Sequence, residues 1–210
     1  MSYRNIKNII FDLGGVILNI DYNLTIKAFE NLGIKHADTF YSQQRQTKIF
    51  DRLETGKLTE EEFCDSIRKI SGIAATNEVI IQAWNAMLLD FPEEITDVLQ
   101  KAKQQYRTFL LSNTNAIHYK AYSQILKKQL GLESLAELFD KQYLSHEIGL
   151  RKPEVKVFKM ILEENGLKAE ETLFIDDSYQ HIKGAEKAGL QTHWLKDNNL
   201  KKFLTENGII

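Results

Sequence analysis

The sequence predicts an α/β fold with a doubly wound parallel sheet and a helical segment inserted after the first strand. Short apolar runs at residues 9–11, 108–111 and 172–175 are typical of buried strands in parallel sheets, and helical patterns lie between them. Residues 23–90 contain no convincing strand. The helices of that stretch are therefore expected to form a separate lid rather than ordinary crossover connections.

The first strand ends abruptly at Asp12, and two glycines then break the apolar run. Four helices are expected to follow before the next strand. Asp21 is a candidate N-cap for the first of them, and Thr59 with Glu62 forms a capping box for the third. The expected helices of the insertion cover residues 21–32, 38–53, 59–70 and 77–89.

Strands and helices alternate in the rest of the chain, which is the pattern of a parallel sheet. Pro92 and Pro153 are each expected at the first position of a helix. The expected helices cover 92–103, 116–130, 153–165 and 182–188, and the expected strands cover 108–111, 141–144, 172–175 and 191–195. We therefore expect a core domain formed by residues 1–18 and 91–210, with residues 19–90 as a helical cap domain.

Composition excludes several broad classes of protein. The net charge of −2 over 210 residues argues against a general nucleic-acid or membrane-surface role. The single cysteine, Cys64, excludes an internal disulfide and fits a reducing compartment, and its helical context indicates a small core residue. No apolar stretch reaches membrane-spanning length. We expect a cytoplasmic monomer or homodimer that binds neither nucleic acid nor membrane.

Polar clusters follow three of the predicted strands. They are Asp12, the pair Ser112–Asn113 and the pair Asp176–Asp177, and Lys152 precedes a predicted helix near the same edge. Because the carboxyl ends of parallel strands meet at one edge of a sheet, these side chains are expected to converge. Each has an ordinary alternative as a turn residue, a helix cap or a surface lysine. Their joint occurrence at one edge favours a functional site.

This set of residues suits phosphoryl transfer. Several carboxylates in one pocket repel each other, and a divalent cation with oxygen ligands, above all Mg²⁺, removes that penalty. Asp12 is then placed to attack phosphorus as a nucleophile. Lys152, the Ser112 hydroxyl and loop amides would hold the charge of the transferring group.

The segments DLGGV, LLSNTN, GLRKP and LFIDDS, in this order, resemble the four motifs of the haloacid dehalogenase superfamily. The resemblance implies a Rossmann-like core with a type 1 helical cap and an aspartyl-phosphate on Asp12. It also implies that Lys152 steadies the nucleophile and the phosphate. The implied phosphate ligands are Ser112, Asn113, Lys152 and Gly15, and the implied Mg²⁺ ligands are Asp12, the Gly14 carbonyl, Asp177 and, partly through water, Asp176.

The sequence departs from the superfamily at Gly14, where phosphatases usually carry an aspartate that acts as general acid and base. The chain resembles a glucose-1-phosphate phosphatase-like branch that also lacks this aspartate. Three explanations stay open: an inactive relative, an acid borrowed from elsewhere such as Asp21 or His118, or a leaving group that needs little protonation. A sugar 1-phosphate has such a leaving group, because a hemiacetal hydroxyl is more acidic than an alcohol.

Two other functions remain as alternatives. A 2-haloacid dehalogenase would need a cation for the halide or carboxylate, and Arg45 and Arg52 lie in the insertion. However, the Asp176–Asp177 pair favours Mg²⁺ and hence a phosphatase. A catalytically weak binding or regulatory module is the other alternative. Substrate specificity is expected to depend on Arg52, Glu54 and Lys57, unless these side chains only cover a solvated surface.

Overall fold

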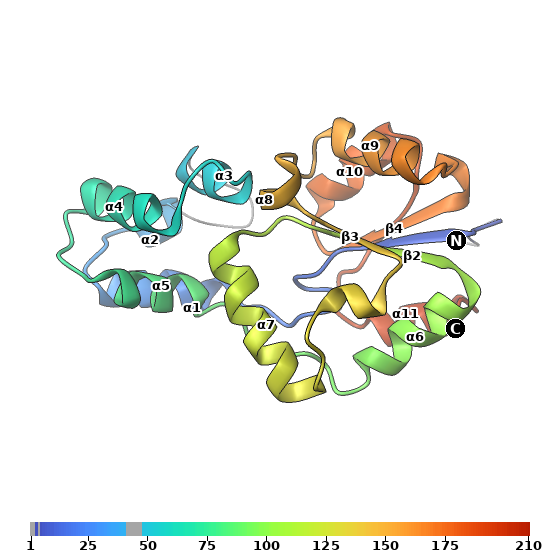
Figure 1. The fold of residues 1–210 in the computed structure, drawn as a ribbon, viewed down its shortest axis with the longest axis horizontal. Coiled ribbons are helices and arrows are strands. Elements are labelled where there is room, and N and C mark those ends of the chain that lie inside the picture. Colours follow the sequence, from blue (N-terminus) through green and yellow to red (C-terminus); the bar gives the residue numbers. More distant parts are fainter. Residues whose placement is uncertain (1–2, 4, 41–47) are drawn as a thin grey trace.

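The computed structural model describes residue 3 and residues 5–40 and 48–210, and contains the predicted α/β fold (Figure 1). Five parallel strands form one sheet in the order β3-β2-β1-β4-β5. The strands are β1 (Asn8–Phe11), β2 (Arg107–Ser112), β3 (Lys141–Leu144), β4 (Thr172–Asp176) and β5 (Gln191–Trp194). The central position of β1 places the end of its strand, and thus Asp12, in the middle of the carboxyl edge of the sheet.

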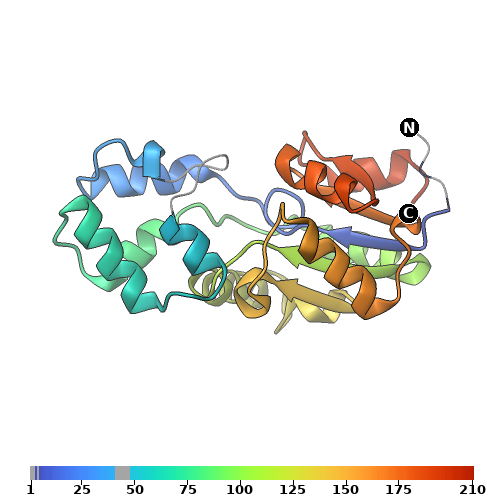
Figure 2. The ribbon, with the colours of Figure 1, turned by 90° about the horizontal axis from the view of Figure 1, so that it is seen from above.

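Successive residues of the central strands face opposite layers of helices, as strand geometry requires. Ile9 and Phe11 pack into one apolar cluster with helices α6 (Ile95–Gln105), α7 (Ala116–Leu130) and α11 (Leu200–Glu206). Ile10 packs into another, with α9 (Val155–Asn165) and α10 (Tyr179–Lys187). The sheet is therefore covered on both faces, which explains its near-continuous apolar strands (Figures 1 and 2).

The helices between β1 and α6 form a separate body beside the sheet (Figure 2). They are α1 (Tyr22–Asn31), α2 (Ala37–Phe40), α3 (Lys48–Glu54), α4 (Glu60–Ser71) and α5 (Asn77–Asn85). Their apolar residues gather around Trp84 in a cluster of their own, to which the core contributes Ile117. The two connecting segments pair with each other, since Asn19 donates to Asp90 and Leu89 donates back to Asn19.

Several predicted boundaries are wrong for identifiable reasons. The helix expected from Pro92 begins at Ile95, because a turn closed by the Ile95 amide and the Pro92 carbonyl precedes it. The helix expected from Pro153 begins at Val155, after a turn in which Glu154 donates to the Arg151 carbonyl. The helix expected over 77–89 ends at Asn85, because residues 87–89 pair instead with the other connecting segment.

Within the range 38–53, where one helix was expected, the described residues form α2 and α3. Residues 41–47 between them, including Arg45, lie outside the described residues. Helix α10 begins at Tyr179 and not at Ile182, because the Ser178 carbonyl already accepts the amides of the first turn. Four of the described elements had no prediction: α8 (Ser145–Ile148), α11 and the 3₁₀ turns η1 (Leu135–Leu138) and η2 (Ala169–Glu171).

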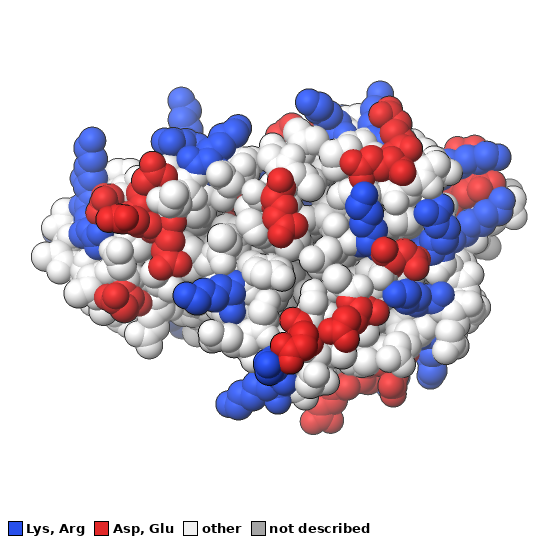
Figure 3. All heavy atoms as spheres, viewed as in Figure 1, with Lys and Arg blue, Asp and Glu red and all other residues white. Residues whose placement is uncertain are grey.

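Other sequence-based expectations concern the surface and the cysteine. Cys64 is fully buried in the core of the insertion, and burial raises the pKa of its thiol to about 11. None of the helices in the described ranges is long and apolar enough to cross a membrane. Basic and acidic side chains are interspersed over the face shown in Figure 3.

Candidate active site

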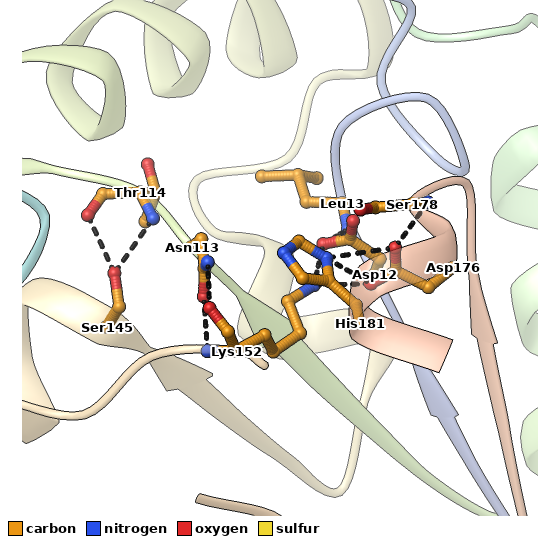
Figure 4. A network of polar contacts seen from close by, with 9 residues as sticks. All are labelled: Asp12, Leu13, Asn113, Thr114, Ser145, Lys152, Asp176, Ser178 and His181. Atoms are coloured by element: carbon orange, nitrogen blue, oxygen red, sulfur yellow. Dashed lines mark hydrogen bonds and ion pairs between the residues drawn. The ribbon is translucent and has the colours of Figure 1, made fainter. Parts of the chain in front are cut away.

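A buried lysine links two carboxylates at the carboxyl edge of the sheet (Figure 4). The Nζ atom of Lys152 lies 2.6 Å from Oδ1 of Asp12 and 2.7 Å from Oδ2 of Asp176. Asp12 follows β1 and Asp176 ends β4, so the neighbouring strands bring them together. All three side chains are buried, and a buried charge is tolerated only when it is paired.

The electrostatics of this group make Asp12 the more easily protonated of the two carboxylates. Burial and the nearby charge of Asp176 raise the pKa of Asp12 to about 7, although Lys152 opposes the shift. Burial would also raise the pKa of Asp176, but Lys152 and His181 hold it well below its usual value. Burial lowers the pKa of Lys152, and the two carboxylates outweigh this effect and raise it. A further cation would stabilise ionised Asp12.

Asp176 is held by groups at the start of α10. The Ser178 amide donates to its Oδ1 at 2.7 Å, and Nδ1 of His181 lies 3.0 and 3.1 Å from its two carboxylate oxygens. Because a carboxylate only accepts, Nδ1 of His181 carries the hydrogen. One oxygen each from Asp12 and Asp176 and one ring nitrogen of His181 lie within 4.8 Å of one another, as the ligands of a metal ion would.

The loop after β2 is fastened to the segment that carries the lysine. The side-chain amide of Asn113 donates to the Lys152 carbonyl, and its oxygen accepts from the Lys152 amide, both at 2.9 Å. The Asn113 side chain therefore positions Lys152. Asn115, rather than Ser112, caps α7 by accepting from the His118 amide, so the capping alternative for Ser112 does not hold.

One cavity contains most of the predicted site. Asp12 lines it together with Gly14, Ser112, Asn113, Asp177, Arg151 and Glu54. Gly15, in the same loop, has a φ of +74°, and a Cβ there would lie 2.5 Å from Oδ2 of Asp177. A side chain at position 15 would thus displace Asp177. Carboxylates and a nearby backbone carbonyl are the hard oxygen donors that Mg²⁺ prefers, so the residues present fit this ion.

The side chain of Ile20, which packs against Gly14, would have to shift to admit the side chain of an acid at that position. The φ of Gly14 is not positive, but a Cβ at this position would lie 2.9 Å from Cδ1 of Ile20, which also lines the cavity. Of the two proposed substitutes for the acid, His118 lines the cavity with Asp12, and Asp21 is not among its lining residues. Asp21 caps α1 by accepting from the Asn23 amide. His118 is buried with its Nε2 3.2 Å from the Trp84 carbonyl, and burial lowers its pKa to about 4.

The predicted specificity residues divide between two places. Glu54 is buried and lines the cavity with Asp12, whereas Arg52 and Lys57 line a neighbouring cleft. That cleft lies between α3 and the turn that leads into α9 and also receives His181.

Two site residues were missed by the sequence reading. Arg151 precedes Lys152 in the motif GLRKP, and its guanidinium forms ion pairs with Asp51 and Glu54 of α3. His181 lies five residues after Asp176, and a helix starting at Tyr179 instead of Ile182 would have placed it over the site. The adjacency of Arg151 to the predicted lysine was the available signal.

Comparisons with known proteins agree with this arrangement. A family model described as haloacid dehalogenase-like hydrolase matches residues 9–195. The D-ribitol-5-phosphate phosphatase of Bacteroides thetaiotaomicron is 34% identical over 189 residues, which cover 89% of this chain and 90% of the relative.

Solved structures show the same likeness over the full fold. A haloacid dehalogenase family enzyme from B. thetaiotaomicron, in complex with magnesium and inorganic phosphate, is 36% identical with a TM-score of 0.83. The match covers 91% of this chain and 94% of that one. A predicted hydrolase from Porphyromonas gingivalis is 30% identical over 96% of this chain and 98% of its own, also with a TM-score of 0.83. The chain belongs to the haloacid dehalogenase-like hydrolase family.

Proposed function

We propose that this protein is a Mg²⁺-dependent phosphatase that hydrolyses a small sugar or polyol phosphate through an aspartyl-phosphate on Asp12. The observation that carries the proposal is the buried contact of Lys152 with Asp12 and Asp176. Asp12 also lines a cavity with Ser112, Asn113 and Asp177. The names of the relatives support the same class of reaction, since one is a ribitol-phosphate phosphatase and others are glyceraldehyde 3-phosphate phosphatases.

In this proposal Asp12 attacks phosphorus, and the bond from phosphorus to the ester oxygen breaks. Lys152 holds the nucleophile and the charge that develops on the phosphoryl oxygens. The Ser112 hydroxyl and the backbone amides of Asn113 and Gly15 bind those oxygens. Water then hydrolyses the acyl phosphate and restores Asp12.

Asp12, Asp177, Asp176 and the Gly14 carbonyl would hold the Mg²⁺. The ion would neutralise the carboxylates and the charge of the bound phosphate. Magnesium in the solved relative supports this assignment. A metal-free dehalogenase is less well supported, because the acidic pair Asp176–Asp177 beside the nucleophile favours a divalent cation.

We also propose that residues 19–90 act as a cap domain on a core formed by residues 1–18 and 91–210. The apolar cluster around Trp84 and the pairing of the two connecting segments support this division. Glu54 would then be the cap residue that meets the substrate, and Arg52 and Lys57 would act from the neighbouring cleft.

The leaving group is the open question within this class. The lack of an acid at Gly14 favours a sugar 1-phosphate as the substrate. The similarity to a D-ribitol-5-phosphate phosphatase favours instead an ester at the terminal hydroxyl of a polyol. Without a general acid, the chemical step should slow as the leaving group becomes more basic.

Single-turnover rates with Mg²⁺ test both points. We expect p-nitrophenyl phosphate and sugar 1-phosphates to react much faster than sugar 6-phosphates. A flat dependence on leaving-group pKa would mean that another residue donates the proton. Absence of phosphate release from every ester would refute the phosphatase and favour the binding or regulatory alternative.

A further inference from the structure

Arg151 reaches from the core into the helical insertion. Its backbone is fixed beside Lys152, whose amide and carbonyl are both bonded to Asn113. Its Nη2 atom lies 2.9 Å from Oε2 of Glu54, and its Nη1 atom pairs with Asp51. The guanidinium thus meets two carboxylates on one face of α3.

The two carboxylates have different surroundings. Glu54 has a side chain only 6% exposed and lines the cavity with Asp12. Asp51 is 48% exposed and lines the neighbouring cleft instead. Arg151 lines both, so of its two partners only Glu54 faces the place where phosphate chemistry is proposed.

Arg151 also has a buried donor without a hydrogen bond. Its Nε has no hydrogen-bond partner among the described residues, and an unsatisfied buried donor is costly. An oxygen atom of a ligand in the cavity would satisfy it. Glu54, beside it, offers a carboxylate that accepts hydrogen bonds.

We infer that Arg151 and Glu54 form a recognition pair for hydroxyl groups on the leaving group of the substrate. A hydroxyl both donates and accepts, so it can bond the carboxylate and the guanidinium together. The charge of Arg151 is more than balanced by Asp51 and Glu54, so a second phosphate would be repelled. An apolar chain would leave the buried Nε of Arg151 without a hydrogen bond. The inferred substrate class is a monophosphate ester of a polyol or sugar, and the inference rests on the proposed phosphatase function.

A purely structural role for Arg151 is the competing explanation, because the ion pairs also join the insertion to the core. The insertion touches the core elsewhere too, since the Gly56 backbone lies against the carbonyl of His146 in α8. Asp51 provides the matched control. Asp51→Asn weakens the same interdomain contact without changing the wall of the catalytic cavity.

The experiment compares Glu54→Gln and Asp51→Asn on three substrates with Mg²⁺. Ribitol 5-phosphate and n-pentyl phosphate both release a primary alcohol, but only the first carries hydroxyls. p-Nitrophenyl phosphate reports on the catalytic residues alone. We expect wild type to prefer ribitol 5-phosphate over pentyl phosphate by about 10–100-fold in kcat/KM, from one or two charged hydrogen bonds.

Glu54→Gln should lower kcat/KM for ribitol 5-phosphate more than for n-pentyl phosphate, so that most of this preference is lost. Arg151→Lys, which keeps the charge but lacks Nε, should do the same. Asp51→Asn should leave the preference intact. Equal losses on all three substrates in Glu54→Gln, or equal wild-type rates on the two alkyl esters, would overturn the recognition pair. Failure of wild type on all three substrates would instead refute the phosphatase itself.

Discussion

Replacing Asp12 by asparagine should abolish turnover and, at the same time, stabilise the metal-free fold. The amide removes the attacking oxygen but keeps the shape of the side chain. Burial and the charge of Asp176 raise the pKa of Asp12 from 3.8 to about 7. This difference in pKa lowers the free energy of unfolding of the metal-free protein by on the order of 4 kcal/mol above pH 7.

The sign of the effect follows from proton binding. The unfolded chain releases the Asp12 proton near pH 4, and the folded protein releases it near pH 7. Between these values the folded state binds more protons, so stability falls as pH rises, and the penalty is complete above pH 7. In the Asp12→Asn variant this dependence disappears, while Lys152 keeps its partner Asp176.

Thermal unfolding in chelator measures the prediction. At about 2–4 °C per kcal/mol, the variant should melt about 8–16 °C above wild type at pH 8, and the difference should shrink to less than half at pH 5. Added Mg²⁺ should then stabilise wild type more than the variant. A variant that melts at or below wild type at pH 8, or a difference that does not depend on pH, would refute this account. Retained phosphatase activity would refute Asp12 as the nucleophile.

Three further outcomes are expected. Asp177→Ala should weaken Mg²⁺ binding at least about tenfold by calorimetry, and unchanged affinity would remove Asp177 from the ligand set. Gly15→Ala should lose activity because its Cβ displaces Asp177, whereas Gly72→Ala, with the same φ of +74° in open surroundings, should cost only about 1–2 kcal/mol of stability. Equal activity losses in both would exclude the displacement. Mg²⁺ affinity should rise between pH 6 and pH 8, since Asp12 must lose a proton whose pKa is about 7; a pH-independent affinity would contradict this.

The fold was largely predictable because its signals are local. The apolar runs before Asp12 and Asp176 are buried on both faces of the sheet. A continuous apolar run is the usual sequence pattern of such strands in parallel sheets. The errors in predicted helix boundaries lie where hydrogen bonds between distant segments determine where a helix ends. Leu89 bonds Asn19 instead of continuing its helix, and no pattern within residues 77–89 indicates that partner.

The candidate site was predictable only in part, for a similar reason. Motif residues at strand ends share one edge by topology alone, so Asp12, Ser112 and Asp177 were expected to line one cavity, as they do. Asn113 was expected to bind phosphate, which stays a prediction, while the bonds of its side chain to the backbone of Lys152 were not expected. The contact of Arg151 with Glu54 depends on where α3 meets the core, which local sequence does not encode.

The surroundings of Gly14 connect the missing acid with the shape of the cavity. Ile20 lies where a side chain at position 14 would begin, and it belongs to the segment that leads into the insertion and bridges to Leu88. The place of the acid is thus taken by an apolar residue whose backbone also joins insertion and core. An aspartate at position 14 would require the Cδ1 atom at the end of the Ile20 side chain to move, whereas the other side-chain atoms of Ile20 lie at ordinary contact distance. Within the described part of the insertion, Glu54 is the buried charged residue that lines the same cavity as Gly14 and Ile20.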